Sequence, residues 1–236
     1  MISFYSGTPG SGKSLEVARD IIFKLTIKKQ NVIANFEIDT DQVYYKKYSK
    51  KRKKTGEFFH VDNEELTVEY LYKYAKEHHK RGVEGQTLLV IDESQMKFSP
   101  TVIKIKMQED KFFRVKWLEF MTHHRKLGFD IIMISQFDRL IDAQIRCIFE
   151  YNVIHRKVNN FKFGWFFAIF KISVFVSVNY WYGINTKIGS HFFTYSKKYS
   201  KIYDSYKVFD KKENGFCFDS DKDDILPEKK VIKKTA

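Results

Sequence analysis

An α/β fold is predicted for this chain, with a mainly parallel central sheet flanked by helices and a small C-terminal β-rich extension. Residues 87–93 and 130–136 each contain a run of apolar and β-branched residues, which is typical of a fully buried parallel strand. Residues 1–6 predict another short buried strand, and the apolar spacing over residues 15–29 predicts a helix after it. A further short strand is predicted at residues 31–36. Strands that alternate with helices in this way indicate a parallel sheet.

A phosphate-binding motif lies between the first strand and the first helix. Residues 7–14 match the pattern G-x-x-x-x-G-K-[ST] in the strand–loop–helix context that such a loop requires; the alternative is a glycine-rich turn without a ligand. Glycines permit a tight turn with inward N–H groups, and the helix N-terminus adds partial positive charge. We expect Lys13 to reach the β- and γ-phosphates of ATP and Ser14 to place its hydroxyl on Mg²⁺. The predicted nucleotide contacts are Gly7, Thr8, Pro9, Gly10, Ser11, Gly12, Lys13, Ser14 and Leu15.

The strand at residues 87–93 supplies the acidic partner of this loop. Asp92 lies at the carboxyl end of the strand, the edge at which open α/β sheets bind ligands. We therefore predict that Asp92 and Ser14 hold the Mg²⁺ of bound ATP. Glu93 follows directly, and in many P-loop ATPases this second acid polarises the attacking water. The alternative for Glu93 is an ordinary surface acid on a loop.

Two further side chains are candidates for a part in hydrolysis. Gln136 ends the strand at residues 130–136, where it either senses the γ-phosphate and orients water or is a satisfied strand-end amide. Arg139 and Arg146 lie on a short helix predicted at residues 138–149. In ring-forming ATPases an arginine from a neighbouring subunit stabilises the transition state. Arg146 is therefore a candidate catalytic residue with Lys13, Glu93 and Gln136, and an ordinary surface arginine is the alternative.

Composition places further bounds on the protein. Its 236 residues suit one α/β domain with an appendage. A net charge of +13 predicts attraction to nucleic acid or to an anionic membrane. Two cysteines, Cys147 and Cys217, form no pattern, which indicates a reducing cytosol. Because the chain starts with a sheet strand, no signal peptide is expected.

A basic segment interrupts the α/β pattern at residues 39–54. It carries three tyrosines beside a run of positive charges, comprising Tyr44, Tyr45, Lys46, Lys47, Tyr48, Lys50, Lys51, Arg52, Lys53 and Lys54. Basic side chains contact phosphates and tyrosines stack on bases, so this segment is one candidate for contact with single-stranded DNA. The other interpretation, which we favour, is a solvated and mobile insertion.

Helices account for much of the middle of the chain. The pair Asp62 and Glu65 resembles a capping box that opens a helix ending near residue 80. Residues 94–107 are predicted as a loop or a broken helix, and residues 111–127 as a helix that Gly128 ends. The adjacent histidine pairs at residues 78–79 and 123–124 point about 100° apart on a helix, so we expect no metal site there.

The apolar segment at residues 163–182 has two interpretations. Its length and its aromatic residues at both ends are compatible with a membrane-spanning helix. Lys171 near the middle would cost roughly 2.5–3.5 kcal/mol on insertion, and the valines alternate with period two. We therefore favour β-strands here, with a second strand at residues 191–195. The predicted organisation is a core at residues 1–158, a β-rich extension at 159–208 and a polar, disordered tail at 209–236.

These motifs together resemble the Zot (zonula occludens toxin-like) family, the assembly and extrusion ATPases of filamentous bacteriophages. The phosphate loop and the acidic strand are common to many P-loop ATPases, whereas a later block is specific to the family. The resemblance covers about residues 1–208. The specific block comprises His124, Arg125, Gly128, Asp130, Ile131, Ser135, Gln136, Ile141, Asp142, Ile145, Arg146, Glu150 and Arg156, with Tyr203, Asp204, Ser205 and Tyr206 resembling its end-of-domain signature.

The resemblance implies an ATPase that extrudes single-stranded phage DNA while coat protein assembles on it. It also implies a homo-oligomer, with a hexamer expected, because the family is related to hexameric DNA-pumping ATPases. The implied partners are phage single-stranded DNA or its nucleoprotein, coat or other assembly proteins, and the inner face of the host membrane. The implied location is the host cytoplasm, peripheral to that membrane, or integral through residues 163–182.

The chain departs from the family pattern in one respect, and two other functions would also fit these motifs. Family members usually continue into a transmembrane helix and an outer domain, whereas a polar tail follows Tyr206 here. The rival functions are a DNA-packaging or DNA-segregation translocase and a nucleotide-gated scaffold without enzymatic activity.

Overall fold

The computed structural model describes residues 1–46, 49–158 and 173–203. Residues Met1–Tyr203 form one compact unit. The tail predicted at residues 209–236, the first part of the apolar segment at residues 163–172 and residues 204–206 of the family signature lie outside the described residues.

An eight-stranded sheet is the centre of the described structure, in the order β10-β9-β8-β1-β7-β6-β2-β5. The strands from β8 to β5 run parallel, and β9 and β10 are antiparallel at one edge. This arrangement confirms the predicted mainly parallel sheet. The strands are β1 (Ile2–Ser6), β2 (Asn31–Ala34), β5 (Phe58–His60), β6 (Thr87–Ile91), β7 (Phe129–Ile134), β8 (Tyr151–Lys157), β9 (Val174–Trp181) and β10 (Thr186–Thr194), with a separate hairpin of β3 (Tyr45–Lys46) and β4 (Ser49–Arg52).

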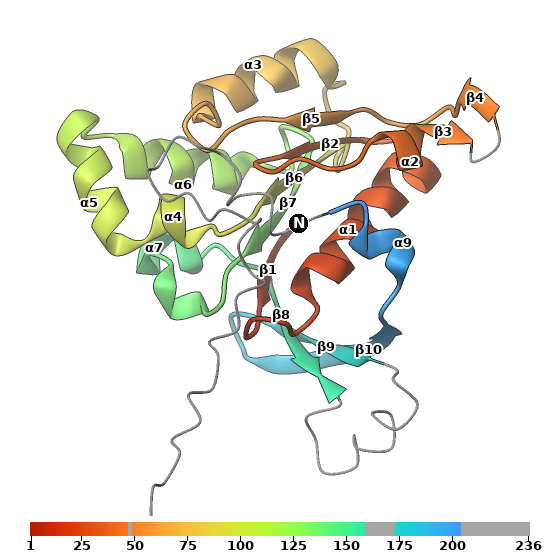
Figure 1. The fold of residues 1–236 in the computed structure, drawn as a ribbon. Coiled ribbons are helices and arrows are strands. Elements are labelled where there is room, and N and C mark those ends of the chain that lie inside the picture. Colours follow the sequence, from red (N-terminus) through yellow and green to blue (C-terminus); the bar gives the residue numbers. More distant parts are fainter. Residues whose placement is uncertain (47–48, 159–172, 204–236) are drawn as a thin grey trace, which may run out of the picture. The chain divides into compact units, whose positions relative to one another are not determined.

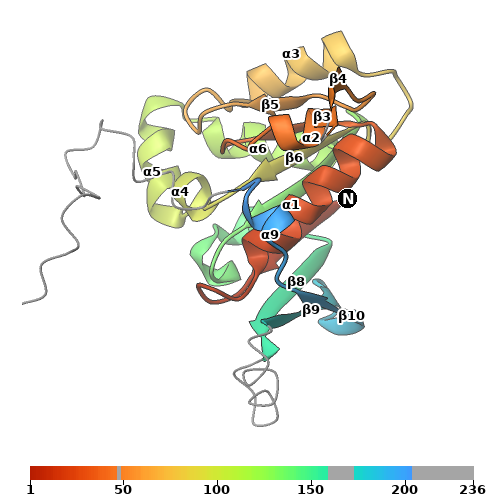
Figure 2. The same cartoon turned by 45° about the vertical axis from the view of Figure 1, so that its right-hand side comes forward.

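Helices cover both faces of this sheet (Figures 1 and 2). On one face lie α1 (Lys13–Phe23) with its π-helical end η1 (Lys24–Lys28), α2 (Asp41–Tyr44) and α9 (Lys197–Ser200). On the other face lie α3 (Val68–His78), α4 (Gln95–Phe98), α5 (Pro100–Glu109), α6 (Phe113–His123) and α7 (Ala143–Arg146), with the short 3₁₀-helix η2 (Asp138–Leu140) before α7.

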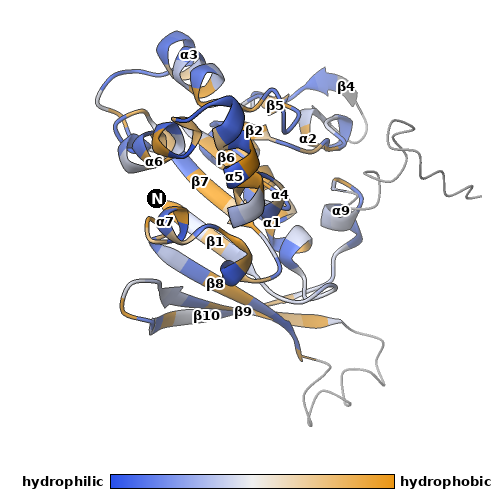
Figure 3. Ribbon diagram, turned by 90° about the vertical axis from the view of Figure 1, so that its left-hand side faces the viewer, coloured by the Kyte–Doolittle hydropathy of each residue, from blue (hydrophilic) through white to orange (hydrophobic). Residues whose placement is uncertain are grey.

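Two hydrophobic cores form because successive strand residues point to opposite faces of the sheet. In β6, Leu89 and Ile91 join the core under α3 and α6, whereas Leu88 and Val90 join the core under α1. Apolar residues therefore occupy most positions of the central strands, which explains the apolar runs in the sequence. Figure 3 shows this apolar stripe along β1 and β7.

The prediction that Asp62 opens the next helix is wrong. The helix α3 starts at Val68, and Thr67 is its N-cap, with its side chain accepting a hydrogen bond from the N–H of Tyr70. Residues 63–65 instead form a turn after β5, closed by a bond from the N–H of Leu66 to the carbonyl of Asp62. Because Leu66 is fully buried, the chain reaches the core before the helix begins.

The single helix predicted at residues 138–149 is also wrong, since η2 and α7 divide it. Asp142 between them is not helical, and its side chain caps α7 by accepting from the N–H of Gln144. The N–H of Asp142 donates to the carbonyl of Phe98 at 2.8 Å, which holds this break against the end of α4.

The predicted broken helix at residues 94–107 and the predicted helix at residues 111–127 are confirmed in outline. Ser99 between α4 and α5 has extended backbone because it precedes Pro100. The helix α6 ends at His123, and Gly128, at φ 85°, completes the turn that follows it.

The strand prediction for the apolar segment is confirmed over its described part. Residues 174–181 form β9, and the predicted strand at residues 191–195 lies largely within β10. Among the described residues, no helix has both the length and the apolar character needed to cross a membrane. The strand β8, which joins these two strands to β1, was not predicted.

A carboxylate on α1 is tied to the sheet beneath it. The Tyr5 hydroxyl donates a hydrogen bond to Oδ2 of Asp20 at 2.8 Å. Burial raises the pKa of Asp20 to about 6, although the bond from Tyr5 opposes this rise. The charged form of Asp20 is therefore held in surroundings that disfavour it.

We predict that Asp20→Asn stabilises the protein at neutral pH. The folded pKa lies above the unfolded value near 3.9, so the wild type loses stability as pH rises from about 4 to 6. The amide has no charge but still accepts from Tyr5. The gain in unfolding free energy should be on the order of 2–3 kcal/mol at pH 7 and vanish below about pH 4. Urea unfolding at both pH values measures it, with the exposed Glu77→Gln as control, and an equal change at both would contradict this account.

Candidate nucleotide-binding site

The strand order brings the predicted site segments to one edge of the sheet. The loop at residues 7–12 follows β1, Asp92 follows β6, and Gln136 lies two residues beyond β7. Because β1, β7 and β6 are neighbours, these three segments meet. The N–H of Gly7 donates to the carbonyl of Gln136 at 3.1 Å, and the N–H of Ser94 donates to the carbonyl of Ile134 at 2.8 Å.

The loop itself depends on glycine at two positions. Gly12 has φ 97° and caps α1, and a Cβ there would lie 2.8 Å from the ring of Phe175. A Cβ on Gly7, at φ 145°, would lie 2.6 Å from the carbonyl oxygen of His155. Both the backbone conformation and the close neighbours therefore exclude a side chain.

Lys13 bonds to the loop that precedes it. Its Nζ donates to the carbonyl of Gly7 at 2.6 Å and to that of Thr8 at 3.3 Å. Burial lowers the pKa of Lys13, although the charges of Glu93 and Asp92 oppose this change. The ammonium group thus already lies on the site edge, close enough to both acids to interact with them.

The residues present fit a bound phosphate group. Oγ of Ser11 is buried and has no hydrogen-bond partner among the described residues, so it is free to serve a ligand. A Cβ on Gly10 would meet no atom within 4 Å, so the loop is open there. The described residues contain no group of three or more histidine, cysteine or acidic side chains that could hold a metal ion. Mg²⁺ here would depend on Ser14, Asp92 and the nucleotide's own oxygens.

Asp92 is held on all sides by hydrogen bonds. Asn35, just beyond β2, accepts from the N–H of Asp92 at 2.7 Å and donates to its carbonyl at 2.8 Å. The carboxylate accepts from the N–H of Glu93 at 2.8 Å and from the Tyr203 hydroxyl. Burial raises the pKa of Asp92, and these two bonds oppose the rise. Burial and the charge of Asp92 together raise the pKa of Tyr203.

Sequence reasoning missed both Asn35 and Tyr203 as site residues. Asn35 could have been found, because it is a polar residue near the carboxyl end of the strand predicted at residues 31–36, at the same sheet edge. Tyr203 was noted only as part of the resemblance's end-of-domain signature, and no local pattern placed it at the site, since the chain returns there only through α9 and the residues after it.

Glu93 occupies an unusual backbone conformation. Its φ of 45° lies in the left-handed region, which non-glycine residues rarely adopt. Such strain persists only where the surroundings impose it, and it gathers at functional sites. The side chain is exposed, and its carboxylate accepts a hydrogen bond from the Gln95 amide. Glu93 is thus free to reach a substrate.

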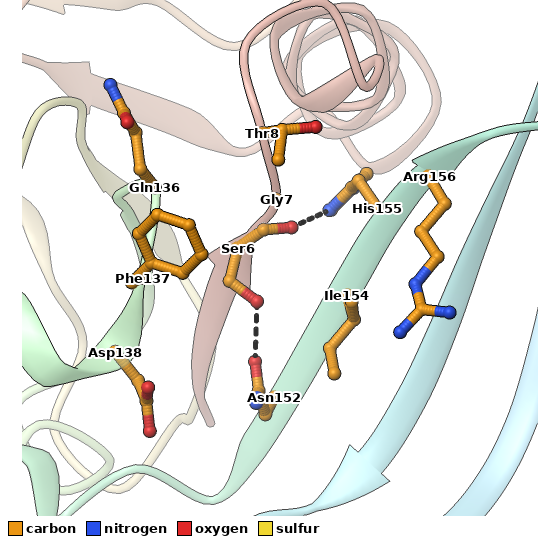
Figure 4. Close-up of a pocket in the computed structure, with 10 residues that line it drawn as sticks. All are labelled: Ser6, Gly7, Thr8, Gln136, Phe137, Asp138, Asn152, Ile154, His155 and Arg156. Atoms are coloured by element: carbon orange, nitrogen blue, oxygen red, sulfur yellow. Dashed lines mark hydrogen bonds between the residues drawn. The ribbon is translucent and has the colours of Figure 1, made fainter. Parts of the chain in front are cut away.

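A pocket of about 410 Å³ lies beside the loop, between Gln136 and β8 (Figure 4). Gln136 and Thr8 line it together with Arg156, which was part of the family-specific block. Arg146 is not among its lining residues. It lies on α7, close enough to Tyr182 to affect the pKa of that phenol. The structure therefore brings Gln136 to the loop of its own chain and places Arg146 elsewhere.

The strands β8 and β9 support the start of α1. Glu16 accepts a hydrogen bond from the Ser177 hydroxyl at 3.1 Å. The other carboxylate oxygen of Glu16 lies 2.7 Å from Nε2 of His155, an ion-pair distance without hydrogen-bond alignment. Nδ1 of His155 faces the carbonyls of Ser6 and Val153, both at 3.1 Å. Sequence reasoning missed this buried layer, because β8, which carries His155, was not predicted and Ser177 in the predicted strand β9 was not assigned to the site.

Solved structures share this fold. The chain is 17% identical to the DNA-packaging ATPase B204 of Sulfolobus turreted icosahedral virus, with a TM-score of 0.51, covering 80% of this chain and 96% of that one. A second solved structure, of the ATPase domain of another protein, is 8% identical, with a TM-score of 0.53, covering 85% of this chain and 83% of that one. At these identities the likeness shows the fold alone, and that fold is the P-loop NTPase fold that the motifs predicted.

A family model adds the family, and a third solved structure is also similar to the chain. The N-terminal domain of zonular occludens toxin from Neisseria meningitidis is 18% identical, with a TM-score of 0.46, covering 86% of this chain and 97% of that one. None of the curated proteins compared with the chain matches it significantly. The family model described as zonular occludens toxin (Zot) matches residues 1–207. The chain is therefore a P-loop NTPase that belongs to the Zot family.

Proposed function

We propose that the chain binds ATP with Mg²⁺ at this site and hydrolyses it to drive the extrusion of filamentous phage. The observation that carries the proposal is the meeting of the loop at residues 7–14 with Asp92, Glu93 and Gln136 at one sheet edge. A cradle for phosphate, an acid for the metal and a second acid for water are the parts that phosphoryl transfer to water requires.

Each residue has a distinct part in this proposal. Lys13 leaves its bonds to the loop carbonyls and pairs with the β- and γ-phosphates. Ser14 and Asp92 hold the Mg²⁺, which when bound neutralises charge on the phosphate oxygens. Glu93 accepts the proton of the attacking water, and Gln136 senses the γ-phosphate from the end of β7.

An oligomer would complete the site, with Arg146 acting on the nucleotide of a neighbouring subunit. Arg146 lies on α7, away from the loop of its own chain, so a role in hydrolysis requires a second subunit. Thr8, Pro9, Gly10 and Glu93 are exposed, which leaves the site accessible to such a neighbour. A hexamer is the expected state, on the resemblance to hexameric DNA-pumping ATPases.

Extrusion implies partners and a location. The proposed partners are phage single-stranded DNA or its nucleoprotein, and coat or other assembly proteins. The proposed location is the host cytoplasm at the inner face of the host membrane; attachment through a helix spanning residues 163–182 is not proposed, because residues 174–181 form β9. The net charge of +13 supports contact with DNA or with anionic lipid.

The basic segment is the proposed DNA contact. Its described part forms α2 and the β3–β4 hairpin, so it has more structure than a mobile insertion requires. The Arg52 guanidinium lies 4.9 Å from the centre of the Tyr44 ring. Nη2 of Arg52 also lies 3.5 Å from Oε1 of Glu57. Lys54, two residues after Arg52, is exposed. A base or phosphate could be held by such a combination of rings and cations.

Two other functions would use the same site. A DNA-packaging or DNA-segregation translocase would show DNA-stimulated hydrolysis without any coat-protein partner. A nucleotide-gated scaffold would bind nucleotide and assembly proteins without hydrolysis. The strained, exposed Glu93 supports hydrolysis over the scaffold.

We predict that Lys13→Ala abolishes nucleotide binding while the fold is retained. Steady-state turnover should fall at least about 100-fold because the phosphate charge loses its cation. ATP hydrolysis, nucleotide titration and circular dichroism measure these effects, with the exposed Lys28→Ala as control. If Lys13→Ala hydrolyses ATP at the wild-type rate, the assignment of the nucleotide site is wrong.

We predict that Glu93→Gln binds ATP as the wild type does but turns it over about 10²- to 10⁴-fold more slowly, because an amide cannot accept the water's proton. Single-turnover hydrolysis with a parallel binding titration separates the two steps, and Glu64→Gln is the exposed control. Weaker ATP binding with unchanged hydrolysis per bound nucleotide would make Glu93 a structural residue.

We predict that replacing Lys51, Lys53 and Lys54 with glutamine weakens binding of single-stranded DNA. Each lost phosphate contact should reduce the slope of log affinity against log salt by about 0.7. The control replaces three exposed lysines with glutamine and so removes the same charge: Lys73 and Lys76 on α3, and Lys80 just after it. If both triple variants have the same slope, net charge accounts for the binding and the hairpin is not the contact.

A further inference from the structure

One aromatic side chain, Tyr203, lies against the predicted metal ligands. Its hydroxyl donates a hydrogen bond to Oδ2 of Asp92, 111 residues earlier in the chain. Ser14 lies close enough to the same phenol to lower its pKa. Ser14 and Asp92 are the two protein groups expected to face Mg²⁺, so this one phenol bonds to one of them and lies beside the other.

The phenol and a bound Mg²⁺ would compete for the same space. Mg²⁺ demands near-octahedral oxygen coordination at about 2.0–2.1 Å and usually keeps several water molecules. In a phosphate-loop site, the serine hydroxyl and the strand-end aspartate meet the metal or its water shell. A phenol that bonds to Asp92 and lies beside Ser14 fills part of the place of that shell. The Tyr203 hydroxyl must therefore leave when Mg²⁺-nucleotide arrives.

Tyr203 is held in this place by packing and by its neighbour in the chain. Its ring lies 4.2 Å from the ring of Phe36, centre to centre, and the residue is only 7% exposed. The carbonyl of Ile202 accepts from the N–H of Asp39 at 2.9 Å, and the Ile202 side chain is buried. The segment that leads there, α9, lies beside α1 (Figure 2). Moving the Tyr203 hydroxyl away from Asp92 therefore also disturbs the contact with Phe36 and the hydrogen bond between Asp39 and Ile202.

We propose that Tyr203 occupies the metal position of the nucleotide-free protein and is displaced by Mg²⁺-nucleotide, which releases the segment from α9 to Tyr203. This proposal rests on the proposed Mg²⁺-ATP site. Tyr203 acts through Ser14 and Asp92, so it is a positioning residue and not a catalytic one.

The negative charge of Asp92 is the reason that Mg²⁺ replaces the Tyr203 hydroxyl there. A neutral phenol satisfies the hydrogen-bonding needs of the Asp92 carboxylate but leaves its negative charge in place. A divalent cation supplies both the contact and the opposite charge. Nucleotide without metal brings only negative charge and leaves the phenol's bond to Asp92 intact. Release of the segment therefore depends on the metal and not on the nucleotide alone.

The first test is Tyr203→Phe, which keeps the ring on Phe36 and removes the hydroxyl. Isothermal titration calorimetry with ADP is run in Mg²⁺ and in EDTA. In Mg²⁺ the variant should bind ADP about tenfold more tightly than the wild type, because no internal donor must be displaced. In EDTA the two proteins should bind ADP equally. Tyr195→Phe is the matched control, since it removes a hydroxyl just before this segment that bonds only to Ser200, at 2.9 Å, among the described residues.

The second test measures release directly by hydrogen–deuterium exchange on the wild type. Mg²⁺-ADP should accelerate exchange of the Asp39 amide and of residues 197–203, whereas ADP in EDTA should not. Slower or unchanged exchange there with Mg²⁺-ADP would overturn the proposal. Equal or weaker binding of Mg²⁺-ADP by Tyr203→Phe would also overturn it, because the phenol would then not oppose the metal.

The two proposals fail in distinguishable ways. If wild type and Lys13→Ala bind ADP equally, the nucleotide site itself is wrong. If only Lys13→Ala loses binding while Tyr203→Phe matches the wild type in Mg²⁺, the site stands and the role of Tyr203 is overturned. Circular dichroism of each variant confirms that a folded protein was measured.

Discussion

A partly buried carboxylate at the end of an apolar strand sets the main constraint on this structure. Asp92 follows a strand whose residues are all buried, so its charge has lost much of the solvation that water gives. Such a group must be hydrogen-bonded or paired in every state of the protein. Asn35 fixes its backbone, the Glu93 amide and Tyr203 serve its oxygens, and the positive charge of Lys13 lies nearby. Residues from four separate parts of the chain thus meet around one side chain.

A second constraint is the rigidity of the phosphate loop. Gly12 has the ring of Phe175 directly against it, and the first turn of α1 is held to β8 and β9 through Glu16. The antiparallel strands therefore do more than enlarge the sheet, since they determine where the loop and the helix N-terminus point. A loop that must present its N–H groups to phosphate gains from such backing, because its orientation is set before a ligand arrives.

The sequence predicted the parts of the fold that depend on local pattern. The buried strands, the phosphate loop and Asp92 all follow from short motifs whose chemistry is contained within a few residues. The predicted start of α3 was wrong. Asp62 and Glu65 fit a capping box, but Leu66 is buried in the core and the helix begins only after its N-cap, Thr67. Tyr203 and His155 could not be assigned to the site, because their positions depend on how distant segments pack. The domain boundaries at residues 158 and 208 and the roles of the site residues stay predictions.

In this structure the protein satisfies its own charged groups, and this has consequences for binding. Lys13 bonds to the carbonyls of Gly7 and Thr8, and Asp92 bonds to Tyr203. Without these bonds, an ammonium and a carboxylate would face the site edge unpaired, which would destabilise the fold. With them, a ligand must break internal hydrogen bonds before it makes its own, so affinity is lower than the new contacts alone would give. Phosphate can replace the partners of Lys13, but only a cation can replace the partner of Asp92. A ligand that carries both is therefore the one for which the exchange is most favourable.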